Sequence, residues 1–214
     1  DKLAGEKESL GLYLTGHPID KYSQEVKVFG SVAISNLKPG NNRVAGLITG
    51  IRTFDTRRGK MAVVTVDDKT GITDVTVTKK MFEKYVDLLI PEKIVLFGGR
   101  CVLDKYTNKT TMQVEKVSAL VDLRERHASH IVLEVPEEAL NSMLIDALRE
   151  ILEKSEEGNA DISVSCIKAR SRANFRFGDK WKVRVSADLI DNLKRLLPED
   201  KIRIEYNTEL SEQG

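Results

Sequence analysis

The sequence predicts a mainly β protein with some α-helix, built as a small five-stranded barrel followed by a small α+β domain. Between residues 43 and 120, five β-type runs occur in the order strand, strand, strand, helix, strand, strand. From residue 129 onward the order is strand, helix, strand, strand, helix, strand. With 214 residues, 41% of them hydrophobic, the chain is long enough to bury two separate cores.

The five β-type runs between residues 43 and 120 predict the barrel. Residues 43–54, 61–67, 72–78, 93–103 and 110–120 are expected to be its strands. Gly59 and Gly71 lie in the two tight connections, where we expect a residue with positive φ. Residues 79–90 place apolar side chains at a helical period before Pro91. This order is that of an OB-fold, which binds oligonucleotides on its strand 2 and 3 face and through its 1-2 and 4-5 loops.

The charge is unevenly distributed along the chain. Residues 43–120 hold 14 Lys and Arg against 9 Asp and Glu, a net charge of +5. Residues 121–214 hold 15 against 19, a net charge of −4, and the first 42 residues balance at 5 against 5. A local positive field suits a polyphosphate partner, because each neutralised phosphate releases counterions. Alternatively, a net charge of +5 can belong to an ordinary solvent-exposed surface that binds no polyphosphate.

The predicted nucleic-acid site consists of basic loop residues and two aromatic candidates. The aromatic rings would offer stacking faces for bases, which tolerate any sequence. Phe54 could instead be barrel core, whereas Tyr106 lies in a turn and is expected to be exposed. The residues expected to meet phosphates are Arg57, Arg58, Lys60, Lys105 and Lys109, and those expected to stack on bases are Phe54 and Tyr106.

The rest of the chain divides into a helical lead-in (1–42), a charged connector (121–128), the α+β domain (129–208) and a tail (209–214). The lead-in is expected to contain helices at 6–14 and 20–28. The α+β domain resembles a βαββαβ unit with an antiparallel sheet and its helices on one face. Its expected elements are strand 130–135, helix 137–153, strand 161–169, hairpin 170–185, helix 187–197 and strand 201–206.

The hairpin expected at 170–185 alternates basic and apolar residues. Its apolar positions include Phe175, Phe177 and Trp181, which are expected to form core. The cationic face is either an ordinary solvent-exposed surface or a docking surface for nucleic acid or an acidic partner. The candidate partner-binding residues on it are Arg172, Arg176 and Arg184.

Catalytic and metal-binding patterns are weak, so no cofactor and no metal are expected. Asp67 and Asp68 open a hairpin turn, where Asp favours local bonds to the backbone, and Asp74 has no further ligands beside it in the sequence. His127 and His130 lack the other ligands of a zinc site. Cys101 and Cys166 are expected to be buried thiols, because each lies in a separate strand-like run. A further set of motifs is absent: phosphate-binding loops, nucleophile elbows and dinucleotide fingerprints.

The chain has no apolar run of the roughly 20 residues that a membrane span needs, and it begins with neither a signal peptide nor a start methionine. We therefore expect a soluble cytoplasmic fragment with no membrane partner.

Residues 10–18 read Leu-Gly-Leu-Tyr-Leu-Thr-Gly-His-Pro, and the basic barrel follows about 25 residues later. This string and this order resemble the C-terminal region of the bacterial replicative DNA polymerase III alpha subunit. The Arg58-Gly59 pair and the Asp67 to Gly71 turn also fall where that family has them. The resemblance implies that the barrel contacts single-stranded template DNA and that residues 129–208 bind the tau subunit of the clamp loader.

The same resemblance implies which functions this chain lacks. The catalytic palm, the fingers and the PHP domain of the family cannot fit in it, so the fragment is not expected to polymerise DNA. Contact with the sliding clamp and the rest of the holoenzyme is expected through residues outside this chain. The segment 24–29 superficially resembles a clamp-binding peptide, but Lys27 stands where an aliphatic anchor is needed. Two other functions stay open: an RNA-binding OB module of the kind attached to tRNA synthetases, and a protein-interaction scaffold.

Overall fold

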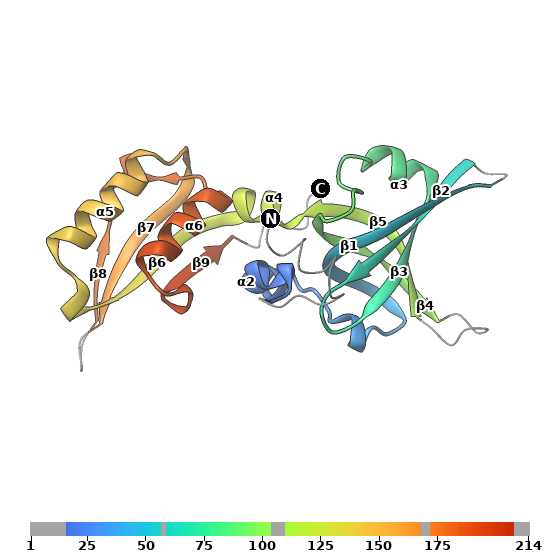
Figure 1. Cartoon of the computed structure of the whole chain (residues 1–214), viewed down its shortest axis with the longest axis horizontal. Helices are drawn as coiled ribbons and strands as arrows, with labels where there is room; N and C mark the ends of the chain where they lie inside the picture. Colours follow the sequence, from blue (N-terminus) through green and yellow to red (C-terminus); the bar gives the residue numbers. More distant parts are fainter. Residues whose placement is uncertain (1–15, 57–58, 104–109, 168–171, 208–214) are drawn as a thin grey trace. The chain divides into compact units, whose positions relative to one another are not determined.

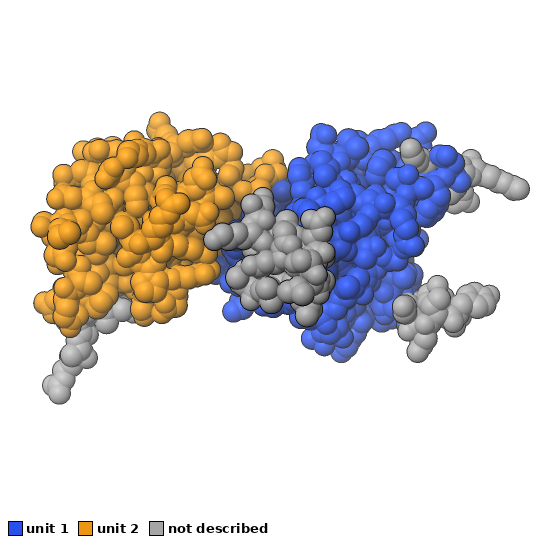
Figure 2. Space-filling view, in the orientation of Figure 1, with its two compact units in different colours: residues 1–120 blue, residues 121–214 orange. Residues whose placement is uncertain are grey.

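The computed structural model describes residues 16–56, 59–103, 110–167 and 172–207. The chain divides into two compact units, residues 1–120 and residues 121–214 (Figure 2). The expected helix at 6–14 and the tail at 209–214 lie outside the described residues.

The first unit contains a closed five-stranded barrel with the strand order β1-β2-β3-β5-β4 (Figure 1). Neighbouring strands are antiparallel except for β3 and β5, which pair in parallel. The predicted OB-type barrel is therefore confirmed. Its strands are β1 (Gly40–Thr56), β2 (Gly59–Asp67), β3 (Ile72–Val77), β4 (Ile94–Leu103) and β5 (Thr110–Ala119).

The barrel encloses the alternate, β-branched positions of its strands. In β2, Ala62, Val64 and Val66 are fully buried, while the residues between them point outward and are partly exposed. Side chains from the other strands and from the helix complete this core, and Phe97 is its largest fully buried member. The alternation leaves a continuous outer face on β1, β2 and β3.

The helix between β3 and β4 is shorter than the apolar period predicts. Helix α3 spans Lys79–Lys84 and ends at Tyr85, whose φ of −119° and ψ of 20° are not helical. Turns then continue to the start of β4, and the N–H groups of Leu88 and Leu89 both donate to the Tyr85 carbonyl. Because this change of direction buries Leu89 against the barrel, packing rather than Pro91 ends the helix.

The turn between β2 and β3 depends on aspartates rather than on glycine conformation. The residue with positive φ is Lys69, at 68°, so the expectation of a positive φ at Gly71 is wrong. Asp67 Oδ1 accepts from the Lys69 N–H, and Asp68 Oδ1 accepts from the N–H groups of Thr70 and Gly71 at 2.9 and 3.0 Å. These bonds hold Lys69 in a left-handed conformation and confirm the local role predicted for both aspartates.

The lead-in forms short helices along one side of the barrel. The helix expected at 20–28 begins as a 3₁₀ helix, Pro18–Tyr22, and continues as α2, Ser23–Val28. A second 3₁₀ helix, Ile34–Asn36, precedes β1. Phe29 follows α2 and is buried, with an exposed fraction of 2%. The clamp-like segment 24–29 therefore has its aromatic residue turned into the unit.

The second unit contains a four-stranded sheet with the order β8-β7-β6-β9. The predicted order of strands and helices is confirmed, but the sheet is mixed rather than antiparallel, because β6 and β7 pair in parallel. A helix between two such strands supplies the crossover that parallel pairing requires. The elements are β6 (Ala128–Pro136), α5 (Ser142–Glu153), β7 (Glu157–Ile167), β8 (Arg172–Arg176), α6 (Ala187–Leu196) and β9 (Ile202–Tyr206).

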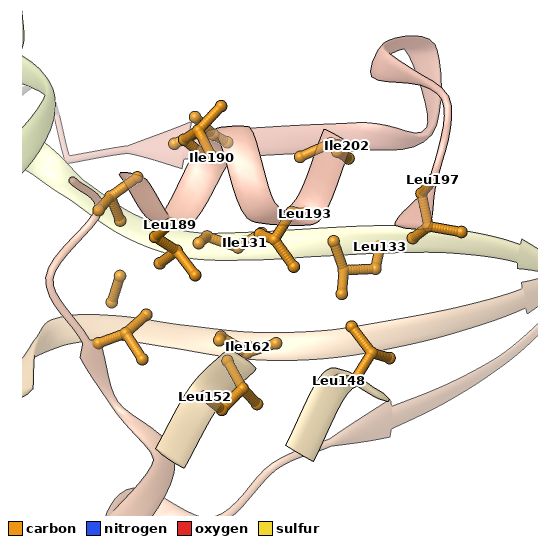
Figure 3. Close-up of a cluster of buried hydrophobic side chains, with 14 of the residues drawn as sticks. Ile131, Leu133, Leu148, Leu152, Ile162, Leu189, Ile190, Leu193, Leu197 and Ile202 are labelled. Atoms are coloured by element: carbon orange, nitrogen blue, oxygen red, sulfur yellow. The ribbon is translucent and has the colours of Figure 1, made fainter. Parts of the chain in front are cut away.

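Helices α5 and α6 pack on the sheet through one core (Figure 3). Ile131, Leu133 and Ile162 are the central sheet residues of this core, and all three have exposed fractions of 1% or less. Leu148 of α5 and Leu193 of α6 are equally buried against them. These aliphatic side chains fix both helices to the sheet.

The helix predicted for 137–153 is interrupted. A 3₁₀ helix spans Glu137–Ala139, and the extended residue Asn141 separates it from α5. The Asn141 side chain accepts a hydrogen bond from the Leu144 N–H at 3.0 Å, so it caps the first turn of α5. Asparagine favours this capping position over a helix interior, which explains the break.

The prediction of a hairpin at 170–185 is wrong, because its first arm pairs antiparallel with β7 rather than with its second arm. Its first arm is β8, but the second arm contains a 3₁₀ helix, Asp179–Trp181, and only isolated bridges from Val183 to Glu157 and Ala160. Phe177 and Trp181 pack against the core and meet edge to face, with ring centroids 6.3 Å apart. This packing replaces a regular second strand.

Residues 121–127 of the segment expected as a charged connector form a helix. Helix α4 spans Leu120–His127 and β6 follows directly. Arg184 joins the helix to the second unit, because its Nε lies 2.9 Å from Glu125 Oε2. No helix in the described ranges is long and apolar enough to cross a membrane.

Candidate nucleic-acid interface

The outer face of the barrel is built by three strands in register. Arg52 of β1 lies opposite Val63 of β2, and Val63 lies opposite Thr76 of β3. Because side chains alternate along each strand, all three point away from the core. Together with Phe54, Asp74 and Thr111 they line a shallow depression of about 390 Å³.

Phe54 is a surface residue and not barrel core. It pairs with Met61 across β1 and β2, and its exposed fraction is 43%. An aromatic ring in this position presents an apolar face beside polar neighbours, which is the arrangement on which an unpaired base stacks. The core alternative for Phe54 is therefore wrong.

Arg52 and Asp74 form an ion pair on this face. Arg52 Nη2 donates to Asp74 Oδ2 at 2.8 Å, across the intervening strand β2. The second oxygen, Asp74 Oδ1, accepts from the Thr65 hydroxyl at 2.8 Å. Sequence reasoning did not select these residues for the interface, because Arg52 and Asp74 are separated by a whole strand and a turn.

The predicted basic loops are close in the sequence to two residues that line the depression. Arg57, Arg58, Lys105, Tyr106 and Lys109 lie outside the described residues, and of Lys60 only the backbone is described, paired with Asp55. The loop holding the first two begins just after Phe54, and the one holding the other three ends just before Thr111. Phe54 and Thr111 both line the depression.

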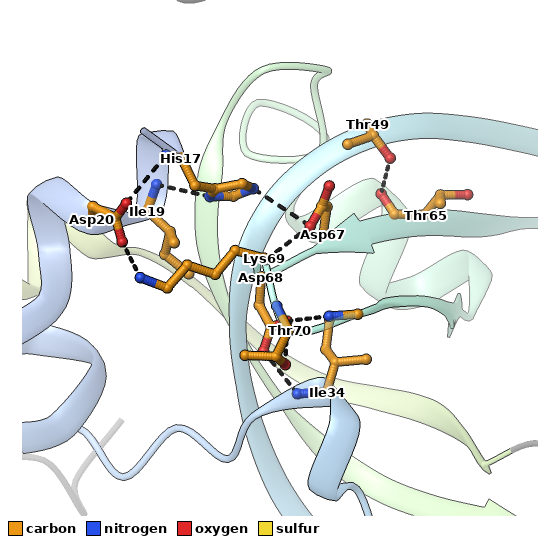
Figure 4. A network of polar contacts seen from close by, with 11 residues as sticks. His17, Ile19, Asp20, Ile34, Thr49, Thr65, Asp67, Asp68, Lys69 and Thr70 are labelled. Carbon is orange, nitrogen blue, oxygen red and sulfur yellow. Dashed lines mark hydrogen bonds and ion pairs between the residues drawn. The ribbon is translucent and has the colours of Figure 1, made fainter. Parts of the chain in front are cut away.

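The lead-in is tied to the β2–β3 turn by a polar network beside this face (Figure 4). His17 Nδ1 accepts from the Ile19 N–H at 3.2 Å, and His17 Nε2 lies 3.4 Å from Asp67 Oδ1. Because Nδ1 is an acceptor, the neutral ring carries its proton on Nε2, toward the carboxylate. Burial lowers the pKa of His17 below its usual value, although nearby Asp67 and Asp20 oppose that shift.

Further bonds strengthen this attachment. Lys69 of the turn forms an ion pair with Asp20. The Ile34 N–H donates to Asp68 Oδ2 at 2.7 Å, and the Ser35 N–H donates to Thr70 Oγ1 at 3.3 Å. The His-Pro end of the motif at 10–18 thus has a structural role, because it anchors the lead-in to the barrel.

The predicted docking arginines of the second unit are engaged within the unit. Arg176 forms an ion pair with Asp161. Arg184 bonds to Glu125 at 2.9 Å and to Glu156 at 3.0 Å, and these hydrogen bonds raise the pKa of its guanidinium. The side chain of Arg172 lies outside the described part of the chain. The cationic face is therefore partly neutralised by its own carboxylates.

One of the three aromatic residues expected in the second core is instead exposed. Phe175 pairs with Val164 on the edge strand β8 and has an exposed fraction of 55%. Among the described strands, β8 lies at the edge of the sheet, which fits the exposure of this ring. Met143 and Ile145 of α5 are also exposed, at 80% and 43%.

The aspartates and histidines considered as metal ligands have other partners. Asp67 and Asp68 bond to the turn, Asp74 bonds to Arg52 and Thr65, and His130 Nε2 lies 2.8 Å from Ser163 Oγ. Within the described ranges, no three His, Cys, Asp or Glu side chains are grouped so that they could hold a metal ion. The two cysteines are both buried and unbridged.

These features define a class of protein, an OB-type barrel followed in the chain by a small α+β domain. Residues 43–120 match the family model described as the OB-fold nucleic acid binding domain. Residues 147–197, which include most of α5 and all of α6, match the model of the C-terminal domain of DNA polymerase III subunit alpha.

Curated relatives extend the second match over nearly the whole chain. DNA polymerase III subunit alpha of Vibrio cholerae is 30% identical over 211 residues, which are 96% of this chain and 18% of that protein. The same subunit of Pseudomonas aeruginosa is 31% identical over 209 residues, again 96% of this chain and 18% of the relative. The chain thus resembles the C-terminal region of DNA polymerase III alpha subunits over nearly its whole length, which confirms the predicted resemblance.

The solved structures show weaker similarity. A small single-stranded DNA-binding protein from Streptomyces coelicolor is 11% identical, with 39% of this chain and 95% of that chain covered and a TM-score of 0.32. A score this low supports no functional argument. The site is therefore assigned from the barrel's own residues.

Proposed function

We propose that the barrel binds single-stranded DNA as a non-catalytic part of a replicative polymerase subunit. The observation that carries the proposal is the exposed Phe54 in a depression on the outer face of the barrel. The net charge of +5 between residues 43 and 120 supports it, because phosphate neutralisation supplies affinity at any sequence. Arg57, Arg58, Lys60, Lys105 and Lys109 would meet phosphates, and Phe54 and Tyr106 would stack on bases.

We further propose that the second unit binds the tau subunit of the clamp loader. The support is the match of residues 147–197 to the C-terminal domain of the alpha subunit, together with the resemblance that assigns tau to this domain. The docking candidates are Arg172, Arg176 and Arg184, and a partner would compete with Asp161 for Arg176 and with Glu125 and Glu156 for Arg184. Contact with the sliding clamp would use residues outside this chain.

Nucleotidyl transfer is not assigned to this chain. The chain spans about 18% of the length of the curated alpha subunits, so we propose that polymerase activity belongs to the remainder of such a protein. The role left to this chain is to hold template DNA and a partner protein.

RNA binding is the second candidate function. The family model that matches the barrel takes its short name from tRNA anticodon binding, and the face of an OB-fold stacks bases of either nucleic acid. RNA differs from DNA by its 2′-hydroxyl, which a protein can use to select RNA. Titration with single strands of DNA and RNA of the same sequence separates the candidates.

Replacement of Phe54 by Ala tests the interface. We expect Phe54→Ala to weaken single-stranded DNA binding about 5- to 150-fold, because the loss of one stacking contact costs about 1–3 kcal/mol. The measurement is fluorescence anisotropy of a labelled oligonucleotide, with duplex DNA and RNA as competitors. Phe175→Ala is the matched control, since Phe175 is also exposed but lies in the other unit. Equal affinities for the two variants would refute the assignment of this face.

A further inference from the structure

The ion pair between Arg52 and Asp74 lies inside the depression that holds Phe54. Arg52 and Phe54 are two residues apart on the same side of β1, so their side chains start about 7 Å apart along the strand. This spacing places the Arg52 guanidinium beside a base that stacks on Phe54. The phosphate next to that base would meet Arg52 first.

Asp74 already occupies the place that such a phosphate would take. One carboxylate oxygen of Asp74 bonds to Arg52 Nη2 at 2.8 Å. Thr65, which lies directly opposite Asp74 in the β2–β3 register, donates its hydroxyl to the other oxygen at 2.8 Å. The Thr65 bond orients the carboxylate, and a guanidinium binds carboxylate and phosphate oxygens through the same donors.

A phosphate can replace Asp74 in its ion pair with Arg52 at little cost. The side chains of Arg52 and Asp74 are exposed by 70% and 43%, and water therefore screens their attraction. Exposed ion pairs contribute little to stability, so opening this pair demands little free energy. A phosphate has the further advantage that its binding releases counterions from the nucleic acid.

We propose that Arg52 is a phosphate subsite of the single-strand interface and that Asp74 acts as its internal counterion, displaced when DNA binds. The inference rests on the proposed DNA-binding function and adds a specific regulation of it. Asp74 lowers the affinity of the face and makes each contact easier to release. A polymerase subunit that moves along a template needs such reversible contacts.

The exchange has a measurable signature in the salt dependence. When DNA displaces Asp74, the freed carboxylate recruits a cation from solution, which offsets part of the counterion release at Arg52. In Asp74→Asn this offset is absent. The slope of log K against log salt concentration should therefore steepen by up to about 0.7, the value for one phosphate on a single strand.

The experiment measures single-stranded DNA affinity by anisotropy at several salt concentrations for matched variants. Glu150→Gln is the control, because Glu150 also forms an exposed ion pair, with Lys154 at 2.6 Å, but in the other unit. We expect Asp74→Asn to bind several-fold tighter at low salt and Glu150→Gln to bind nearly as the parent does. Adding Arg52→Ala to Asp74→Asn should abolish the gain.

A further variant, at Thr65, tests the inference separately from the proposed DNA binding. Thr65→Val keeps the charge of Asp74 but removes its orienting bond, so a smaller gain in the same direction is expected even if Asp74→Asn does not fold. If Asp74→Asn changes DNA affinity no more than Glu150→Gln does, the inference is wrong while the proposed DNA binding stands. The same holds if the gain in affinity of Asp74→Asn persists when Arg52→Ala is added. Absence of single-stranded DNA affinity in the parent chain overturns both the inference and the proposed function.

Discussion

His17 shows how one residue couples two segments of the first unit. Its side chain is only 8% exposed, and it contacts the lead-in through Nδ1 and the β2–β3 turn through Nε2. A neutral imidazole can do both, because one nitrogen accepts while the other donates. Protonation would place a second hydrogen on Nδ1, where the Ile19 N–H already donates.

The pH dependence of stability tests this arrangement. Because burial lowers the pKa of folded His17 below 6.5, the unfolded chain binds the proton more readily. The His17 contribution to stability is present above pH 6.5 and is lost as the pH falls through the lowered pKa. His17→Asn should flatten this loss, since an Asn oxygen can still accept from Ile19 N–H but does not titrate.

Urea unfolding at pH 7.5 and pH 5.5 provides the measurement for both proteins. The charged groups that surround the ring, Asp20, Asp67, Asp68 and Lys69, are present in both proteins, so the two proteins differ only in the side chain at position 17. An equal loss of stability in the parent chain and in His17→Asn would contradict the coupling.

Residue-level prediction from sequence succeeded for local chemistry and failed for pairs across strands. The capping roles of Asp67 and Asp68 follow from turn preferences within a few residues. The pairing of Arg52 with Asp74 depends on the register of three strands, which alternation alone does not determine. The exposure of Phe175 depends on β8 being a sheet edge, and no pattern within residues 172–176 indicates that.

At the scale of elements, one glycine shapes the barrel where β4 approaches β5. The register shifts between Gly98 and Gly99, and a Cβ on Gly99 would lie 2.0 Å from the Gln113 carbonyl oxygen. Backbone atoms cannot yield as a flexible side chain can. A Cβ on Gly98 would meet only Lys116 Cβ, at an ordinary 3.8 Å.

We therefore expect Gly99→Ala to destabilise the barrel by about 1–3 kcal/mol, the range for overpacking, and Gly98→Ala to have a much smaller effect. The two variants change the same atoms at adjacent positions, so each controls for the other. Chemical denaturation followed by far-UV circular dichroism measures the difference in stability between the two variants. Similar unfolding midpoints would show that β5 moves aside without cost.

Strands were easier to predict from this sequence than helix ends. Each predicted strand of the barrel overlaps its observed counterpart almost completely. Helix α3 ends early because Leu89 packs on the barrel, and α5 starts late because Asn141 caps it. Both ends depend on contacts that lie outside the helical period.

At the scale of the whole chain, the boundary between the units lies at the start of α4. Leu120 is fully buried and closes the first unit, whereas Glu125 bonds to Arg184 of the second. Arg124 is also buried, with an exposed fraction of 4%. The charge pattern alone suggests a cut near Arg126, which would divide the helix.

We expect residues 121–214 to fold alone and to bind tau, and residues 1–120 to fold alone and to bind single-stranded DNA. Each unit has its own buried core, and the contact clusters separate at this position. Calorimetric titration of each piece with each ligand tests the division of roles. Tau affinity in residues 1–120 would refute it.

The position of the cut is itself a prediction. A piece that begins at His127 keeps the core of the second unit but loses α4, and with it the Glu125 partner of Arg184. It should unfold at a lower urea concentration than residues 121–214. Glu125→Gln in the longer piece separates the ion pair from the rest of the helix, since it removes only the charge. If the two pieces unfold at the same urea concentration, α4 is a connector that adds no stability to the second unit, as its charged sequence suggests.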